Sequence, residues 1–218
     1  MVSLRHFLFL AAIVTASLTA CNNSKESVTK GSSPLIGKHD LTLESPIMTP
    51  EVLWSFGRIS EISVSPDNKK VLYGVTYYSV AEDKGNRELF VMDVDGSNKQ
   101  QLTHTPFSEY NAVWNPNGSK IGFLSAENGT MQLWEMNADG TGKQQISSVE
   151  SGINAFKYAP DGKKIVFSAD VPKEKPAEKL FEGLDKTTGR LMNDLMYRHW
   201  DHWVDTYSHL FIADLDGK

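Results

Sequence analysis

The sequence has 218 residues, of which 40% are hydrophobic and 22% are charged, with a net charge of −5. This composition is ordinary for a globular protein, and the length allows one large or two small domains. The negative charge and the lack of a basic stripe with interleaved aromatic residues argue against a nucleic-acid partner. A single cysteine excludes an intrachain disulfide framework. No residue pattern calls for a cofactor, and we expect none.

Residues 1–20 have the pattern of a bacterial lipoprotein signal peptide. Arg5 and His6 precede an apolar run at 7–14, which is too short for a stable membrane anchor. The stretch ends in the sequence LTAC, whose last residue is Cys21. The resemblance implies cleavage before Cys21 and attachment of lipid there, with residues 21–45 as a flexible tether. It implies a cell-envelope protein, and Asn22, rather than Asp, after the cysteine favours the outer membrane. An ordinary signal peptide with an incidental cysteine is the alternative.

A short helix is predicted after the tether, in the stretch MTPEVLWS. Thr49 can cap this helix, and Pro50 suits its first position. We expect Leu53 and Trp54 to pack on the first part of the following domain. A place for Trp54 in a ligand site is the alternative.

One turn motif occurs three times, as VSPDNKKVLY, WNPNGSKIGFLS and YAPDGKKIVFSA, with its proline at Pro66, Pro116 and Pro160. Proline presets the backbone for the second position of a type I turn, and Asp, Asn and Gly suit the positions that follow. Apolar residues alternate with others on both sides of each turn. Period 2 across such a turn predicts a β-hairpin.

A second strand motif repeats in step with the first, as LFVMDVDG, LWEMNADG and LFIADLDG. The prolines are 50 and 44 residues apart, as the numbering shows, which is a spacing typical of β-propeller blades. We therefore predict an all-β fold, an incomplete β-propeller of about three four-stranded blades; a meandering sandwich is the alternative. The predicted propeller covers 46–218, with blades at 59–103, 109–147 and 152–218.

The third predicted blade contains an insertion at 170–206. It begins with a charged, proline-containing stretch and continues with helical spacing at Leu191, Leu195 and Met196, so we expect it to be partly helical. It ends in YRHWDHWVD, which we expect to pack on the blade; a role in lining a substrate cavity is the alternative. His199 and His202 could share one face of a helix and bind a metal, but the spacing supplies no third ligand. We therefore predict no metal site.

Together, the lipoprotein motif, the proline turns, the repeated LFVMDVDG-type strands and RHWDHWVD resemble the amino-terminal propeller of a prolyl oligopeptidase-family serine peptidase, in the branch of dipeptidyl-peptidase 5 and acylaminoacyl peptidase. The resemblance implies a peptide substrate and a C-terminal α/β-hydrolase domain with a serine nucleophile in a G-x-S-x-G turn. It implies an exopeptidase that releases dipeptides or short acyl-peptides. This sequence contains no G-x-S-x-G, so no catalytic residue can be assigned, and we expect the chain to be an amino-terminal fragment.

In dipeptidyl peptidases of this family, carboxylates on a propeller insertion bind the free amino terminus of the substrate. The insertion offers acidic residues, together with a neighbouring arginine, as candidate substrate-binding groups: Glu182, Asp185, Arg198, Asp201 and Asp205. The alternative function is that of a non-enzymatic, TolB-like lipoprotein whose propeller binds another protein of the envelope. A downstream G-x-S-x-G, followed by Asp and His, would distinguish the two.

Overall fold

The computed structural model describes residues 35–43, 45–173, 186 and 198–215, all of which belong to one compact unit, Pro34–Lys218. The predicted signal peptide, Cys21 and most of the tether lie outside these residues. Glu182, Asp185 and the predicted helical spacing at Leu191, Leu195 and Met196 also lie outside them. In the part of the chain that the structure describes, no helix is long and apolar enough to cross a membrane.

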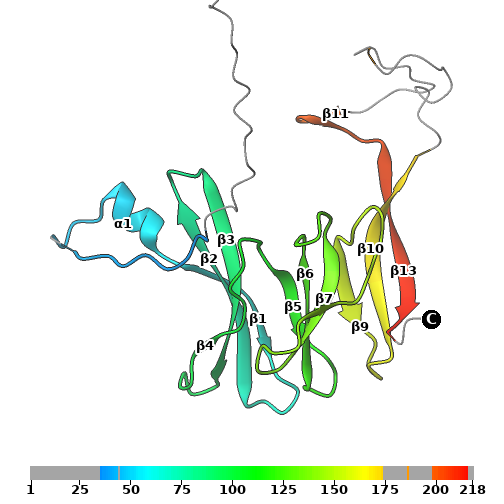
Figure 1. Ribbon diagram of the computed structural model, residues 1–218, viewed down its shortest axis with the longest axis horizontal. Coiled ribbons are helices and arrows are strands. Elements are labelled where there is room, and N and C mark those ends of the chain that lie inside the picture. The colour runs from blue at the N-terminus through cyan, green and yellow to red at the C-terminus, as the bar shows by residue number, and fades with distance from the viewer. Residues whose placement is uncertain (1–34, 44, 174–185, 187–197, 216–218) are drawn as a thin grey trace, which may run out of the picture. The chain divides into compact units, whose positions relative to one another are not determined.

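Antiparallel sheets dominate the described residues (Figure 1). The first sheet has the order β1(Arg58–Val64), β2(Lys70–Ser79), β3(Lys84–Asp93), β4(Gln100–Gln101). The second sheet has the order β5(Tyr110–Trp114), β6(Lys120–Ser125), β7(Gln132–Asn137), β8(Gln144–Gln145). The third has the order β9(Ala155–Tyr158), β10(Lys164–Pro172), β13(Thr206–Asp214), and a hairpin is formed by β11(Arg198–His199) and β12(His202–Trp203). The predicted all-β, propeller-type fold is confirmed.

The three proline motifs form the predicted β-hairpin turns, which join β1 to β2, β5 to β6 and β9 to β10. In each turn, the residue two places after the proline donates its N–H to the carbonyl three residues earlier, at 2.9 Å. That residue has a left-handed backbone, with φ of 57°, 73° and 68° at Asn68, Gly118 and Gly162. Glycine and asparagine tolerate this region best, so the local sequence is sufficient to specify the turns.

The sheets pack face to face through two clusters of buried side chains. The first cluster joins the first and second sheets and includes Leu72, Leu89, Ala112, Trp114, Phe123 and Trp134. The second joins the second and third sheets and includes Leu124, Leu133, Ile153, Phe156 and Ile165. The second sheet is therefore covered on both faces, and burial of apolar side chains provides most of the stability of this arrangement.

The outer faces of the first and third sheets keep their apolar side chains exposed. The sequence pattern predicts that Ile62 and Val64 share a face, as Ala112 and Trp114 do, but Ile62 is 69% and Val64 51% exposed. Leu210 and Ile212 on β13 are exposed in the same way. Within the described residues, no sheet covers these two faces. Equivalent apolar residues are therefore buried in the second sheet, which lies between the other two, and exposed in the first and third.

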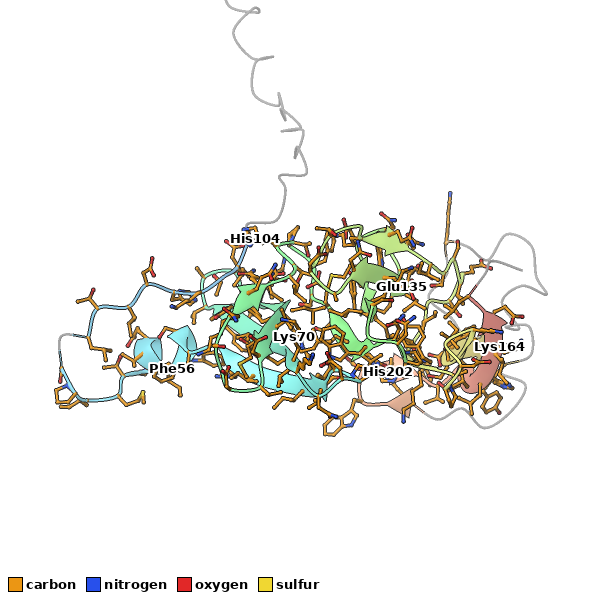
Figure 2. The ribbon with its side chains drawn as sticks, turned by 90° about the horizontal axis from the view of Figure 1, so that it is seen from below. Phe56, Lys70, His104, Glu135, Lys164 and His202 are labelled. Atoms are coloured by element: carbon orange, nitrogen blue, oxygen red, sulfur yellow. The ribbon has the colours of Figure 1, made fainter. Side chains whose placement is uncertain are left out.

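Ion pairs repeat in each sheet between the strand that follows the proline turn and its neighbour. They are Lys70–Asp93, Lys120–Glu135 and Lys164–Asp214. Figure 2 shows the labelled Lys70, Glu135 and Lys164 side chains on three different sheets. Lys70–Asp93 and Lys164–Asp214 are partly exposed and add little stability, whereas Glu135 of the second pair is buried, with 8% of its side chain exposed. Each pair joins two strands of one sheet, so these pairs do not hold the sheets together.

The helix α1(Pro50–Ser55) forms where the sequence predicts it, and Thr49 caps it by accepting a hydrogen bond from the backbone N–H of Val52. The ring of Trp54 packs edge-on against Tyr78 of β2, with 5.5 Å between the ring centroids. The guanidinium of Arg58 lies over both rings, at 4.7 and 4.5 Å from their centroids. Trp54 therefore contacts the first sheet as predicted, although 39% of it remains exposed; Leu53 is 49% exposed.

Candidate functional site

Three of the predicted substrate-binding residues lie on or next to the β11–β12 hairpin. The guanidinium of Arg198 lies 5.6 Å from the ring centroid of Trp203. Asp201 is in the turn of the hairpin, with its side chain 93% exposed, and a hydrogen bond to His202 lowers the pKa of its carboxyl group. The side chain of Asp205 is exposed, and its carbonyl accepts the N–H of Lys173 at 2.9 Å. The hairpin thus presents exposed carboxylates to solvent.

His199 and His202 lie directly opposite each other in the hairpin. The helical arrangement considered from their spacing is therefore wrong for this segment, which turns back on itself at Trp200, where φ is +55°. No group of three or more His, Cys, Asp and Glu residues in the described ranges could hold a metal ion.

A pocket of about 550 Å³, which the sequence pattern did not predict, is lined mainly by β1 and β5. We call the first strand of each sheet, β1, β5 and β9, its inner strand. Each of β1, β5 and β9 is an edge strand of its sheet, and β5 contacts both of the others. The pocket is lined by residues 61–63 of β1 and 110–113 of β5, together with Leu124, Met131 and Asn154. We refer to it as the central pocket.

Two polar side chains in the wall of the central pocket connect one inner strand to the next. Glu61 of β1 accepts a hydrogen bond from the backbone N–H of Asn111 through Oε2, at 2.7 Å. The side chain of Asn111 in turn accepts the N–H of Phe156 at 3.1 Å and donates to the carbonyl of Phe156 at 3.3 Å. Both residues occupy β-bulges and have left-handed φ angles, 54° for Glu61 and 52° for Asn111.

Arg87 of β3 supports this arrangement from the first sheet. Its Nη2 lies 3.0 Å from Glu61 Oε2, an ion pair that lacks hydrogen-bond geometry. Its guanidinium also lies 5.3 Å from the ring centroid of Tyr110, and its side chain is only 8% exposed. Attraction to this buried cation helps to hold the Glu61 side chain in position.

The walls of the central pocket combine carboxylate, amide and hydroxyl groups with apolar side chains such as Leu124 and Met131. None of its lining residues is His, Cys or Lys, so the pocket has groups for binding but no nucleophile paired with a base. One signal in the sequence could have indicated it. Glu61 and Asn111 each stand five residues before a turn proline, and each is a polar residue followed directly by an apolar one in a predicted strand.

Comparison with known proteins identifies the repeat. Residues 57–181 match the family model described as the TolB beta propeller domain. The chain belongs to this family of TolB-type propellers. This TolB-type propeller is 45% identical over 167 residues to dipeptidyl-peptidase 5 of Porphyromonas gingivalis. The aligned residues make up 77% of this chain and 24% of that relative. It is 38% identical over 174 residues to dipeptidyl-peptidase 5 of Porphyromonas endodontalis, covering 80% of the chain and 25% of the relative.

The TolB-type propeller therefore spans about a quarter of the length of the curated relatives that it matches. Its structure is similar to that of an acylaminoacyl peptidase from Pyrococcus horikoshii, with a TM-score of 0.57 and 13% identity, over 76% of this chain and 24% of that one. At this identity the likeness concerns the fold alone. The predicted resemblance to the propellers of the dipeptidyl-peptidase 5 and acylaminoacyl peptidase branch is confirmed.

Proposed function

We propose that this chain is the propeller portion of a serine exopeptidase, which controls the access of short peptides to a C-terminal α/β-hydrolase domain. The observation that carries the proposal is the 45% identity to dipeptidyl-peptidase 5 over 77% of the chain. Because the identity extends over most of the chain, it reflects more than the turn motif, which is common to many propellers.

The central pocket supports a role in binding peptide. Its volume of about 550 Å³ falls within the range of small-molecule sites, about 300–1,000 Å³. Its polar groups can pair with the amides of a peptide, and its apolar residues can contact a side chain. A peptide on its way to a hydrolase domain would meet these walls, whereas the pocket itself supplies no catalytic group.

The function is tested by treating the protein expressed from the complete gene with a fluorophosphonate probe, which labels an activated serine. We expect one labelled serine in a G-x-S-x-G sequence downstream of residue 218, and hydrolysis of dipeptidyl p-nitroanilides. Partition into detergent of the same preparation tests the proposed lipid anchor on Cys21, since a Cys21→Ser variant should remain in the aqueous phase. Recovery of both forms in the aqueous phase would reject the anchor and the envelope location inferred from it.

A protein without a labelled serine would instead support the second candidate, a TolB-like binding module of the envelope. The match of residues 57–181 to the TolB propeller family is the observation that favours it. Such a module would use the propeller surface to bind another protein, and would show no hydrolysis of any peptide in the same assay.

The exposed carboxylates of the hairpin are proposed to bind the free amino terminus of the substrate. In the complete enzyme, Asp201→Asn with Asp205→Asn should lower kcat/KM for peptides with a free amino terminus about tenfold, the effect of losing about 1.4 kcal/mol of ion pairing. Peptides with an acetylated amino terminus serve as the control, because they carry no ammonium and should be cleaved equally by both forms. Equal losses for both classes of peptide would remove these two residues from substrate recognition.

A further inference from the structure

The bulges of β1 and β5 place Glu61 and Asn111 at the same position of the repeat, five residues before Pro66 and Pro116. A left-handed backbone is unfavourable for glutamate, which therefore needs compensation from its surroundings. At both positions the compensation is a hydrogen bond to the inner strand of the next sheet. The two residues thus form a relay from the first sheet to the third, which we call the inner-strand relay.

The relay supplies hydrogen-bond partners to backbone groups of β5 and β9 on the edge where each strand has no neighbouring strand. The N–H of Asn111 and the N–H and carbonyl of Phe156 receive side-chain partners from the preceding sheet. The side-chain amide of Asn111 donates to the carbonyl of Phe156 and accepts from its N–H, as the backbone of a neighbouring strand would. Each inner strand is therefore held at a set distance from the next, although no strand ladder joins the sheets.

The relay stops at the third sheet. The residue five places before Pro160 is Ala155, which has no polar side chain. The adjacent Asn154 instead donates to Asp170 of its own sheet, at 2.9 Å. The relay therefore links β1 to β5 and β5 to β9. Both relay residues, Glu61 and Asn111, line the central pocket.

We propose that Glu61 and Asn111 are positioning residues, which fix the separation of the inner strands and so determine how large a side chain the central pocket admits. This inference rests on the proposed binding of peptides in that pocket. The relay crosses the wall of the pocket, and Arg87 holds one of its ends, so a loss of the relay should loosen the wall without changing the apolar contacts beside it.

Asn111→Gly tests the relay, because glycine accepts the left-handed backbone and removes only the side chain. The matched control is Asn68→Gly, at a left-handed asparagine in an exposed turn. In the protein expressed from the complete gene, the amide of Phe156 should exchange with deuterium at least about tenfold faster in Asn111→Gly, the equivalent of one lost hydrogen bond. Asn111→Asp keeps an acceptor for this amide and should preserve its protection, and Asn68→Gly should leave it unchanged.

The role in selectivity is measured by the binding of fluorescent tripeptides that carry alanine or phenylalanine at the central position. The wild type should bind one of the two at least about fivefold more tightly, and Asn111→Gly should bring the two affinities to within about twofold of each other. Unchanged exchange at Phe156 would reject the relay. Faster exchange with unchanged selectivity, or no binding of either peptide to the wild type, would reject the role in the pocket. The fluorophosphonate assay is independent of both readouts, so a failed peptidase assignment is recognised separately.

Discussion

Replacement of Glu109 by glutamine is expected to stabilise the protein at pH 8 and to remove much of the dependence of its stability on pH. Glu109, in the connection between β4 and β5, is fully buried, and Glu88 beside it is 1% exposed. Burial, followed by the charge of Glu88, raises the pKa of Glu109 to about 8. Hydrogen bonds that the ionised carboxylate would accept from Thr105 and Thr103, and the charge of Lys143, oppose this shift. The carboxyl group is therefore expected to hold a proton at neutral pH.

The hydrogen-bond geometry agrees with a protonated Glu109. The hydroxyl of Thr105 lies 2.8 Å from the carbonyl of Phe107, which can only accept, and 2.9 Å from Glu109 Oε1. A hydroxyl has one proton, so both contacts are hydrogen bonds only if Glu109 donates to the hydroxyl. The other oxygen, Oε2, accepts from Thr103 at 3.0 Å. Glutamine can reproduce this pattern, with its NH₂ group toward Thr105 and its oxygen toward Thr103.

The sign of the pH dependence follows from the raised pKa. The folded protein binds the proton of Glu109 more tightly than the unfolded chain, in which the pKa is near its ordinary value of 4.5. This group therefore contributes its full stability below pH 4.5, and the contribution is lost as the pH rises towards about 8. The loss amounts to at most about 1.4 kcal/mol for each pH unit between the two pKa values, so the free energy of unfolding of the glutamine variant should exceed that of the wild type by roughly 4 kcal/mol at pH 8.

Urea denaturation at pH 5 and pH 8 measures the effect. The wild type should lose free energy of unfolding between the two values, and Glu109→Gln should lose much less. Glu82→Gln, at an exposed glutamate, is the control for the change of net charge. If Glu109→Gln is less stable than the wild type at pH 8, the carboxyl group is ionised in the folded protein and its partners differ from those described above.

A larger residue at Gly122 is expected to separate the second sheet from the third. A Cβ atom at Gly122 would overlap the hydroxyl of Tyr158, which reaches across from β9 and donates to Glu135 at 2.8 Å. Gly122→Val would displace this ring and break its hydrogen bond to a carboxylate. Overpacking and the lost bond together should cost roughly 3 kcal/mol of the free energy of unfolding.

The equivalent position in the third sheet provides the matched control for Gly122→Val. Val166 stands six residues after its turn proline, as Gly122 does, but lies on the open face, so Val166→Leu should change stability by less than about 0.5 kcal/mol. Removal of the ring in Tyr158→Ala should make room for the new side chain. The double variant should therefore be more stable than the sum of the two single effects predicts, and strict additivity would contradict the proposed overlap.

The sequence by itself was sufficient for the features that depend on a few neighbouring residues. The turn at Pro66 and its two repeats, and the cap of α1 by Thr49, are determined by backbone preferences over four or five residues. The spacing of these signals then predicted the propeller, because a blade cannot bury both of its faces alone and needs its neighbours. The repeated motifs also predicted the branch of the family that the comparisons confirm.

Only the tertiary structure decided how the repeats differ from one another. Leu72, Gly122 and Val166 occupy one position of the motif, yet only the glycine lies beneath a tyrosine of the next sheet. Glu61 reaches a backbone N–H 50 residues away, and Asn111 one 45 residues away. Such contacts depend on the distance and angle between packed sheets. These quantities result from the burial of many side chains at once, and no short stretch of sequence contains them.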